Sequence, residues 1–239
     1  MLQETFAERS SADRQTSLQR FKQLDGTMVW NRLRDEAVIA VLTVDRVAHA
    51  VPLARALVDG GIGVLELTMR TPVAVDAVGE IQRNVPEAVV GMGTITSSDQ
   101  ATDAAAAGAA FGVAPGLNPQ VVRAARDRDL PFMPGIVTPS EIERAVDLGC
   151  RVLKFFPAEA SGGLAYLNSM AAPYDHLDLR YVPLGGIHAG NLRRYLDDPR
   201  ILAVGGTWIA SRKLIAAEDW ATITANARQA RTLVEQASR

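Results

Sequence analysis

The sequence is short of several residue types, and each shortage excludes a class of protein. Only one of its 239 residues is a cysteine, Cys150, so no disulfide can form within the chain. The apolar stretch around Cys150 predicts an ordinary buried side chain, and we expect a cytoplasmic protein, because that compartment keeps thiols reduced. No apolar run in the sequence approaches the roughly 18 residues of a membrane-spanning helix, so no membrane partner is expected.

The sequence also lacks an excess of basic residues and has few histidines. A formal net charge of −2 leaves no basic excess of the kind that follows a nucleic-acid backbone. The three histidines, His49, His176 and His188, lack metal-ligand spacing, so surface or capping roles are predicted for them. We therefore predict no metal, no cofactor and no nucleic-acid partner, and expect the protein to bind a small molecule.

What the sequence does contain is a regular alternation of apolar strands and helices. Residues 1–25 form a polar arm that lacks the apolar surface to fold alone. A short helix is predicted over residues 27–37, and after it eight apolar runs with strand character alternate with segments of helical spacing. These runs cover residues 38–44, 63–69, 89–95, 111–117, 131–137, 151–157, 181–187 and 201–210.

Eight strand–helix units in a chain of this length predict an α/β fold, a single (β/α)8 TIM barrel of parallel strands joined by crossovers. The barrel is expected to span residues 26–239 as one domain. The alternative is a doubly wound open sheet, whose dinucleotide-binding form needs a glycine fingerprint after the first strand. The glycines of GMGTIT lie at the third strand instead, so the sequence favours the barrel.

A lysine interrupts the apolar run RVLKFFPAEA. Lysine is rarely buried, because an unpaired ammonium group is costly to remove from water. Alternation along the strand directs Lys154 to the barrel interior, and the same parity in GVLELTMR directs Glu66 and Arg70 inward. The lysine and the glutamate are therefore expected to share one cavity.

This pair of residues suits Schiff-base chemistry. An apolar pocket favours a neutral lysine amine, which can attack a carbonyl, and Glu66 is predicted as the acid/base group that moves the protons. Arg70 and Thr94 are predicted to donate hydrogen bonds to a substrate carboxylate. Taken alone, the residues also fit a structural ion pair between Lys154 and Glu66.

Two glycine pairs follow the last two predicted strands, in LGGIHAGN and VGGTWIA. Glycines let backbone N–H groups approach an anion closely, and barrels often bind phosphate at this place, although either pair alone also fits a tight turn. The predicted phosphate-binding residues are Gly185, Gly186, Gly205 and Gly206. Pro115 and Phe156 fit apolar walls of the pocket or plain core. The expected ligand is a phosphorylated keto acid.

The order and spacing of these motifs resemble the class I 2-dehydro-3-deoxy-6-phosphogluconate (KDPG) aldolases, a family that includes 4-hydroxy-2-oxoglutarate (KHG) aldolase activity. The resemblance runs from about residue 28 to the C-terminus and is carried by HAVPLARALVDGG, VLELTMRT, VPEAVVGMGT, APGLNP, MPGIVTPSE, KFFPAEASGG, GGI and VGGTW. It implies that Lys154 is the Schiff-base lysine, that Glu66 is the acid/base group, and that Arg70 and Thr94 hold the pyruvoyl carboxylate. It also implies phosphate binding by the glycine pairs and a homotrimer of barrels.

The reaction that the resemblance implies is cleavage of KDPG to pyruvate and glyceraldehyde 3-phosphate by an aldehyde-lyase. Two positions depart from the family pattern. Leu184 stands where Thr is usual, so two other substrates stay open: the galactonate analogue of KDPG, and KHG. Thr207 stands where Ser is common, but it keeps a hydroxyl for the phosphate. Two rival functions are a carboxylate- or metal-dependent isomerase on the same barrel and a non-catalytic barrel that binds a phosphorylated ligand.

Overall fold

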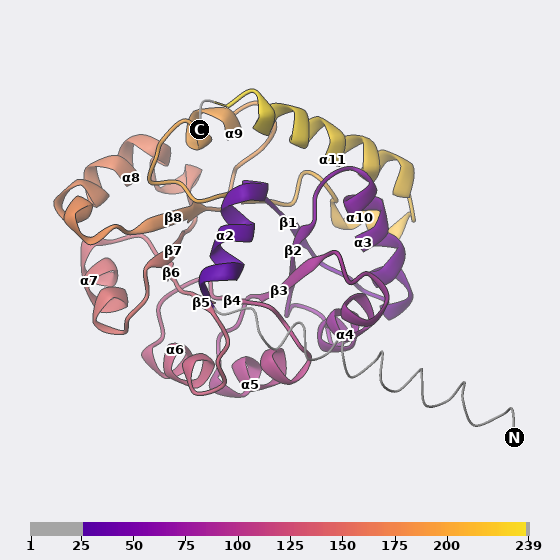
Figure 1. Ribbon diagram of the computed structural model, residues 1–239, viewed down its shortest axis with the longest axis horizontal. Coiled ribbons are helices and arrows are strands. Elements are labelled where there is room, and N and C mark those ends of the chain that lie inside the picture. Colours follow the sequence, from indigo (N-terminus) through magenta and orange to yellow (C-terminus); the bar gives the residue numbers. More distant parts are fainter. Residues whose placement is uncertain (1–25, 238–239) are drawn as a thin grey trace, which may run out of the picture.

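Strands occupy the centre of the molecule and helices surround them (Figure 1). The structure, a computed structural model, describes residues 26–237, so the predicted polar arm and the last two residues lie outside the described part. Helix α2 (Gly26–Glu36) confirms the predicted first helix and packs against strands β1 (Val38–Leu42) and β2 (Val64–Thr68).

Nine strands lie within the described residues, and all their pairings are parallel, as predicted. One sheet has the order β5-β4-β3-β2-β1-β9 and a second has the order β6-β7-β8. The remaining strands are β3 (Val89–Gly93), β4 (Gly112–Val113), β5 (Phe132–Met133), β6 (Gly135–Ile136), β7 (Val152–Phe155), β8 (Arg180–Pro183) and β9 (Val204–Gly206).

Each predicted apolar run overlaps a strand, and the fifth run contains two, β5 and β6. Pro134 separates them, because proline has no N–H to donate to a strand ladder. The fourth run is much shorter than predicted, since the chain leaves β4 just before Pro115. Between β8 and β9, isolated parallel bridges pair Tyr181 with Ile201 and Leu184 with Gly205, and β5 contacts β7 at the other junction. Both edges of the larger sheet therefore meet the smaller one.

Helices follow the strands as the sequence pattern predicted, and several begin at recognisable caps. Two of them begin with a capping box, formed by Ser97 with Gln100 and by Thr138 with Glu141. In each box, the side chain of one residue accepts a hydrogen bond from the backbone N–H of the other, and the reverse also holds. The helices are α3 (Ala50–Asp59), α4 (Ala74–Asn84), α5 (Ser98–Ala106), α6 (Pro119–Arg126), α7 (Pro139–Asp147), α8 (Gly163–Ala171), α9 (Leu192–Leu196), α10 (Arg212–Ala216) and α11 (Trp220–Glu235). Short 3-10 segments are η1 (Val47–His49), η2 (Glu159–Ser161) and η3 (Ala172–Leu177). No helix of residues 26–237 combines the length and the apolar character needed to cross a membrane.

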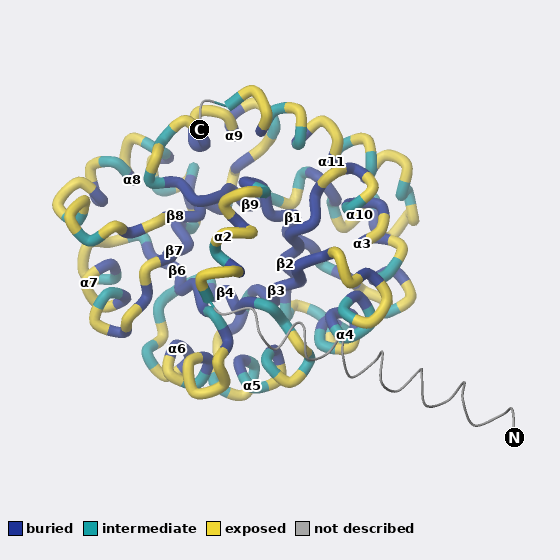
Figure 2. Tube along the Cα trace, viewed as in Figure 1, coloured by how far each residue is buried: buried dark blue, intermediate teal, exposed yellow. Residues whose placement is uncertain are grey.

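Buried apolar side chains fall into two clusters that follow the strand alternation. Figure 2 shows that the strands are largely buried, whereas the surrounding helices alternate between buried and exposed residues. Leu65 and Leu153 belong to the cluster that packs the strands against the helices. Val64 and Val152, one position away on the same strands, belong to a second cluster together with Val29 of α2. Because Glu66 and Lys154 have the parity of the second pair, they face the interior between the strands.

Candidate active site

Lys154 of β7 and Glu66 of β2 face each other in the interior. The Lys154 Nζ and Glu66 Oε1 atoms are 3.7 Å apart, and the two side chains are only 7% and 1% exposed. Strand alternation, set by the apolar neighbours that pack against the helices, directs both side chains inward. The structure therefore brings the predicted pair together and buries both side chains almost completely.

The Glu66 carboxylate is buried without a hydrogen-bond donor. Neither of its oxygens has a hydrogen-bond partner among the described residues. Its room comes from Gly93, which pairs with Thr68 across β2 and β3: a Cβ atom at Gly93 would lie 2.0 Å from Glu66 Oε1. Buried polar atoms without partners are rare, and here both oxygens are able to accept a proton or a hydrogen bond from a bound molecule.

The surroundings of Lys154 are mainly apolar. Its Nζ lies 5.0 Å from the centre of the Phe156 ring, close enough for a cation–π contact, and Val182 is its register partner on β8. On the other side its register partner is Gly135, where a Cβ atom would meet the carbonyl of Pro115 at 2.3 Å. The predicted wall residues Phe156 and Pro115 therefore flank the strand segment that carries the lysine.

Thr94 and Arg70 follow β3 and β2 directly. Thr94 is half-buried and has a φ of 61°, a left-handed conformation that is rare for a β-branched residue and marks stored backbone strain. Arg70 is exposed in the turn after β2, where its N–H donates to the carbonyl of Thr68 at 2.8 Å. Strand parity therefore does not determine the direction of Arg70, because β2 ends at Thr68 and the turn breaks the alternation.

The two glycine pairs lie side by side. The bridge between Leu184 and Gly205 joins the two segments that carry the glycine pairs. The buried Leu184 side chain packs closely against Gly205, because a Cβ atom at Gly205 would lie 2.7 Å from Leu184 Cγ. Gly185 and Gly186 have φ values of 94° and 83°, which side chains rarely allow. The first glycine pair also lies next to Phe156, which is close to Lys154. A Cβ atom at Gly185 would lie 3.2 Å from the Phe156 ring.

Several backbone donors of these loops have no protein acceptor. Within the described part of the chain, the N–H groups of Gly186, Ile187 and Thr207 make no hydrogen bond. Thr207 is exposed one residue beyond β9, next to Gly206 at its end. Free N–H groups on neighbouring glycine-containing turns are typical of an anion-binding site.

Among the histidines, one prediction is wrong. His49 is buried, its Nε2 lies 3.1 Å from Glu218 Oε1, and its ring packs edge-on against Trp220, because helix α11 covers the start of α3. His188 has a local capping contact, in which its Nδ1 accepts from the N–H of Gly190, and His176 is exposed. Residues 26–237 contain no group of three or more His, Cys, Asp or Glu side chains placed to hold a metal ion.

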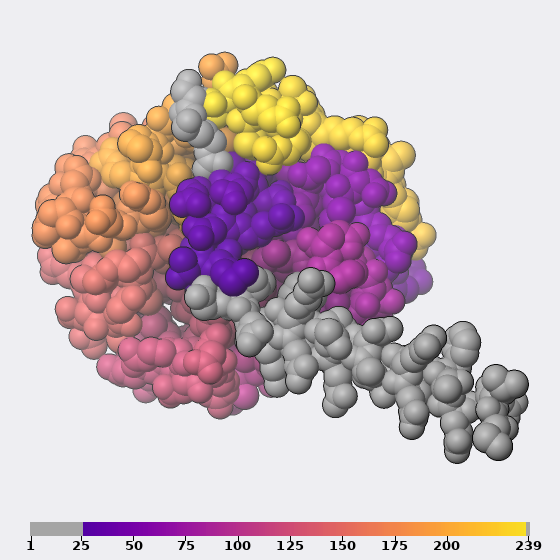
Figure 3. Space-filling model, in the orientation of Figure 1, coloured from indigo at the N-terminus to yellow at the C-terminus, as the bar shows by residue number. Residues whose placement is uncertain are grey.

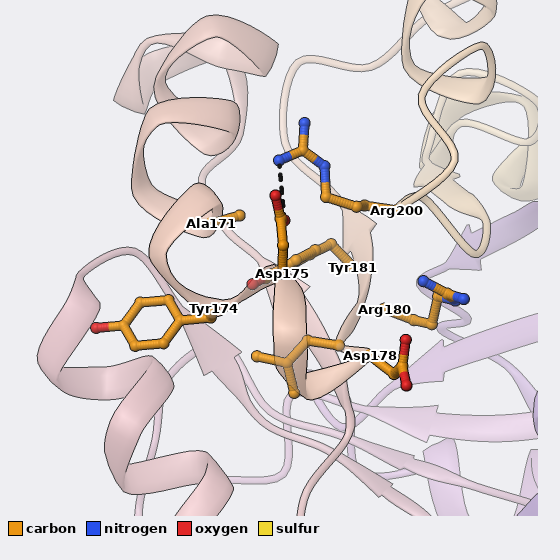
Figure 4. Close-up of a pocket in the computed structure, with 8 residues that line it drawn as sticks. Ala171, Tyr174, Asp175, Asp178, Arg180, Tyr181 and Arg200 are labelled. Carbon is orange, nitrogen blue, oxygen red and sulfur yellow. Dashed lines mark ion pairs between the residues drawn. The ribbon is translucent and has the colours of Figure 1, made fainter.

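A small polar cavity of about 30 Å³ lies at the opposite, starting end of β8 (Figure 4). Arg200 forms an ion pair with Asp175 there at 3.6 Å, and burial raises the pKa of Tyr181 to about 12. Its lining contains none of the predicted site residues.

The sequence analysis gave no role to Gly93 or Gly135. The missing side chain of Gly93 leaves room for Glu66, and that of Gly135, the register partner of Lys154, leaves room for the backbone of Pro115. Only the strand register reveals those close approaches.

Comparison with known proteins agrees with this geometry. The family model for KDPG and KHG aldolase matches residues 29–226. A 2-dehydro-3-deoxy-phosphogluconate aldolase of Treponema pallidum is 45% identical over 86% of this chain and 97% of its own length. The KHG/KDPG aldolase of Escherichia coli is 43% identical over 81% of this chain and 90% of its own length.

A solved structure shows the same fold. The KDPG aldolase from Legionella pneumophila, with pyruvate captured at low pH as a covalent carbinolamine intermediate, has a TM-score of 0.80 and 34% identity, covering 87% of this chain and 98% of that one. Parallel strands around a buried lysine–carboxylate pair, in a chain with these relatives, define the class as an aldehyde-lyase. The chain belongs to the KDPG and KHG aldolase family, which confirms the predicted resemblance.

Proposed function

We propose that this enzyme cleaves KDPG reversibly to pyruvate and glyceraldehyde 3-phosphate through a Schiff base on Lys154. The observation that carries the proposal is the buried pair of Lys154 Nζ and Glu66 Oε1, 3.7 Å apart, with both Glu66 oxygens lacking a protein donor. An ion pair that served only packing would have its carboxylate hydrogen-bonded more completely. The relatives named as KDPG aldolases supply the substrate class.

The reaction begins when Lys154 passes a proton to Glu66 and its neutral amine attacks the C2 carbonyl of the substrate, which forms a carbinolamine. Glu66 donates a proton to the departing hydroxyl, so that water leaves and an iminium forms. Glu66, now ionised, takes the proton of the C4 hydroxyl, directly or through water. The C3–C4 bond then breaks, its electron pair moves into the iminium, and the aldehyde is released. Protonation of the enamine at C3 and hydrolysis free pyruvate and restore the lysine.

The remaining site residues bind the two ends of the substrate. Arg70 and Thr94 hold the pyruvoyl carboxylate. The guanidinium of Arg70 is exposed and makes no ion pair with a described residue, so it is available to bind that carboxylate. Pro115 and Phe156 form the apolar walls. The phosphate binds to the N–H groups of the glycine loops and to Thr207. These phosphate-binding residues are Gly185, Gly186, Gly205, Gly206 and Thr207.

The finer architecture is part of the same proposal. Residues 26–239 form one closed (β/α)8 barrel, supported by the bridges between β8 and β9 and by the contact of β5 with β7. The predicted homotrimer and cytoplasmic location stay predictions. Sedimentation equilibrium of the full chain tests the trimer, which a monomer mass would contradict.

Trapping of the Schiff base tests the mechanism. Incubation with pyruvate and borohydride should add one reduced pyruvyl group to Lys154, located by peptide mass spectrometry. The Lys154→Arg variant should take up no label, whereas Lys213→Arg, which changes an exposed lysine on α10, should label like the wild type. Label on another residue, or none on the wild-type protein, would contradict the scheme.

A substrate panel tests the specificity. Pyruvate release should be fastest from KDPG among KDPG, its galactonate analogue and KHG. Leu184 supplies no hydroxyl near the polar end of the substrate, so the enzyme should discriminate weakly between the two C4 configurations. Chelator-sensitive activity that survives Lys154→Ala would instead favour a metal-dependent isomerase.

A further inference from the structure

Glu159 has no role in the proposed reaction, yet it joins three segments next to the glycine loops. It lies in η2, in the motif KFFPAE after β7. Its carboxylate accepts hydrogen bonds from Arg194 Nη2 at 2.6 and 2.7 Å and from the Tyr195 hydroxyl, both on α9. The pKa of Glu159 lies below its usual range. The main cause is the hydrogen bond from Tyr195, and the hydrogen bond and positive charge of Arg194 lower the pKa further. Glu159 thus ties the segment after β7 to the helix after β8.

The backbone around Glu159 holds the carbonyl side of the first glycine loop. The carbonyl oxygens of residues 184–186 accept hydrogen bonds in turn from Ala158 N at 2.7 Å, Glu159 N at 3.0 Å and Asn191 Nδ2 at 2.9 Å. Each of these carbonyls shares a peptide plane with the N–H of the next residue. Fixing the three carbonyls therefore also fixes the directions of the N–H groups of residues 185–187. The N–H groups of Gly186 and Ile187 stay without a described protein acceptor.

Close packing fixes the loop from the same side. A Cβ atom at Gly186 would lie 2.6 Å from Glu159 Cβ, so the loop backbone rests directly on the Glu159 side chain. Asn191 is buried, and its Oδ1 accepts from the N–H of His188 at 2.8 Å, which fixes the far end of the loop. The loop is therefore supported along its length by Glu159 and Asn191.

From these contacts we infer that Glu159, held by Arg194 and Tyr195, is a positioning residue that presents the N–H groups of Gly186 and Ile187 to the substrate phosphate. The inference rests on the proposed function. A carboxylate close to an anion site would ordinarily repel the ligand. Here both oxygens of Glu159 are engaged by the guanidinium of Arg194, which offsets their charge and leaves the side chain to act as a brace.

Substrates with and without a phosphate distinguish this role from plain structural support. Glu159→Gln and Tyr195→Phe weaken the brace, and each should raise KM for KDPG by about tenfold, the usual effect of one charge-assisted hydrogen bond. The KM for KHG, which has no phosphate, should stay unchanged, as should pyruvate trapping on Lys154. Arg193→Ala is the matched control, because Arg193 is exposed on the same helix and, among the described residues, forms an ion pair with Asp197 at 3.9 Å and not with Glu159.

Binding of inorganic phosphate gives a readout that needs no turnover. Titration calorimetry of the full-length protein should show phosphate binding that is about tenfold weaker in Glu159→Gln and Tyr195→Phe but unchanged in Arg193→Ala. If the wild type binds phosphate in this pattern but cleaves no phosphorylated acid, the proposed function fails while the positioning role stands.

Two results would overturn the inference. One is phosphate affinity that is the same in both brace variants as in the wild type. The other is an equal rise of KM for KDPG and KHG in variants whose circular dichroism matches the wild type, which would show a general structural role. If Glu159→Gln does not fold, Tyr195→Phe decides the question, because it removes only a hydroxyl.

Discussion

Two glutamates of this protein, Glu66 and Glu159, lie in opposite circumstances. Glu66 is 1% exposed, and neither oxygen has a described hydrogen-bond donor. Glu159 is 33% exposed, and its carboxylate receives hydrogen bonds from an arginine and a tyrosine. Glu66, the more deeply buried of the two carboxylates, therefore has fewer hydrogen-bond partners than Glu159. Such an imbalance is tolerated where a group must react with a ligand, whereas a satisfied carboxylate holds structure in place.

The largest expected effect comes from removing the lysine that faces Glu66. Lys154→Ala should lose all aldolase activity above background, a fall of roughly a millionfold or more, because no other described side chain supplies an amine at this place. Release of pyruvate from KDPG measures the loss. If the variant kept activity within tenfold of the wild type, the pair of Lys154 and Glu66 would be structural. Glu66 would then not differ in role from Glu159.

Glu66→Gln should have the next largest effect. The amide keeps the shape of the side chain but cannot exchange a proton, so kcat should fall by about 10²–10⁴-fold. The matched substitution Glu159→Gln should leave kcat nearly unchanged. Steady-state kinetics of both variants on one substrate would sharpen the comparison, and equal losses of kcat would break it.

Gly93→Ala tests whether the space around Glu66 matters. The new Cβ would lie 2.0 Å from Glu66 Oε1, so the carboxylate must move, and activity should fall about a hundredfold. Overpacking should also cost about 1–3 kcal/mol of unfolding free energy, measured by urea denaturation. Gly149→Ala, at a site with open space around it, separates the crowding from the loss of a glycine, although its φ of 82° adds local strain.

The smallest effect concerns acid stability and Glu159. Its folded pKa lies below the ordinary value of 4.5, so its pairing stabilises the fold above that pH and the stabilisation is lost as pH falls through the folded pKa. Glu159→Gln should therefore lower the melting temperature at pH 7 by an amount equivalent to about 1 kcal/mol or less, and the difference from the wild type should shrink below pH 4.5. A difference that grows with acidification would show the sign to be wrong.

Much of the fold was predictable because its signals are local. Each apolar run overlapped a strand, and strand parity alone placed Lys154 and Glu66 in the same interior. Parity does not determine the direction of Arg70, because where a strand ends depends on the turn that follows. It also gave no warning that Pro134 would divide the fifth strand in two.

Residues whose surroundings come from distant segments were not predictable. The burial of His49 depends on Glu218 and Trp220, which come from the far end of the chain. The contacts of Glu159 with Arg194 and Tyr195 span 35 and 36 positions, and no spacing rule covers that separation. Sequence pattern therefore located the reacting pair but not the residue that supports the glycine loop.

Helix α2 covers the middle of one face of the molecule (Figure 3). Its buried residues Val29 and Leu33 pack among the interior side chains near the beginnings of the strands, whereas the glycine loops lie at the strand ends. The apolar side of α2 therefore fills the end of the interior at which the strands begin. In the proposed reaction, the substrate and both products would then have to pass the opposite end, beside the glycine loops.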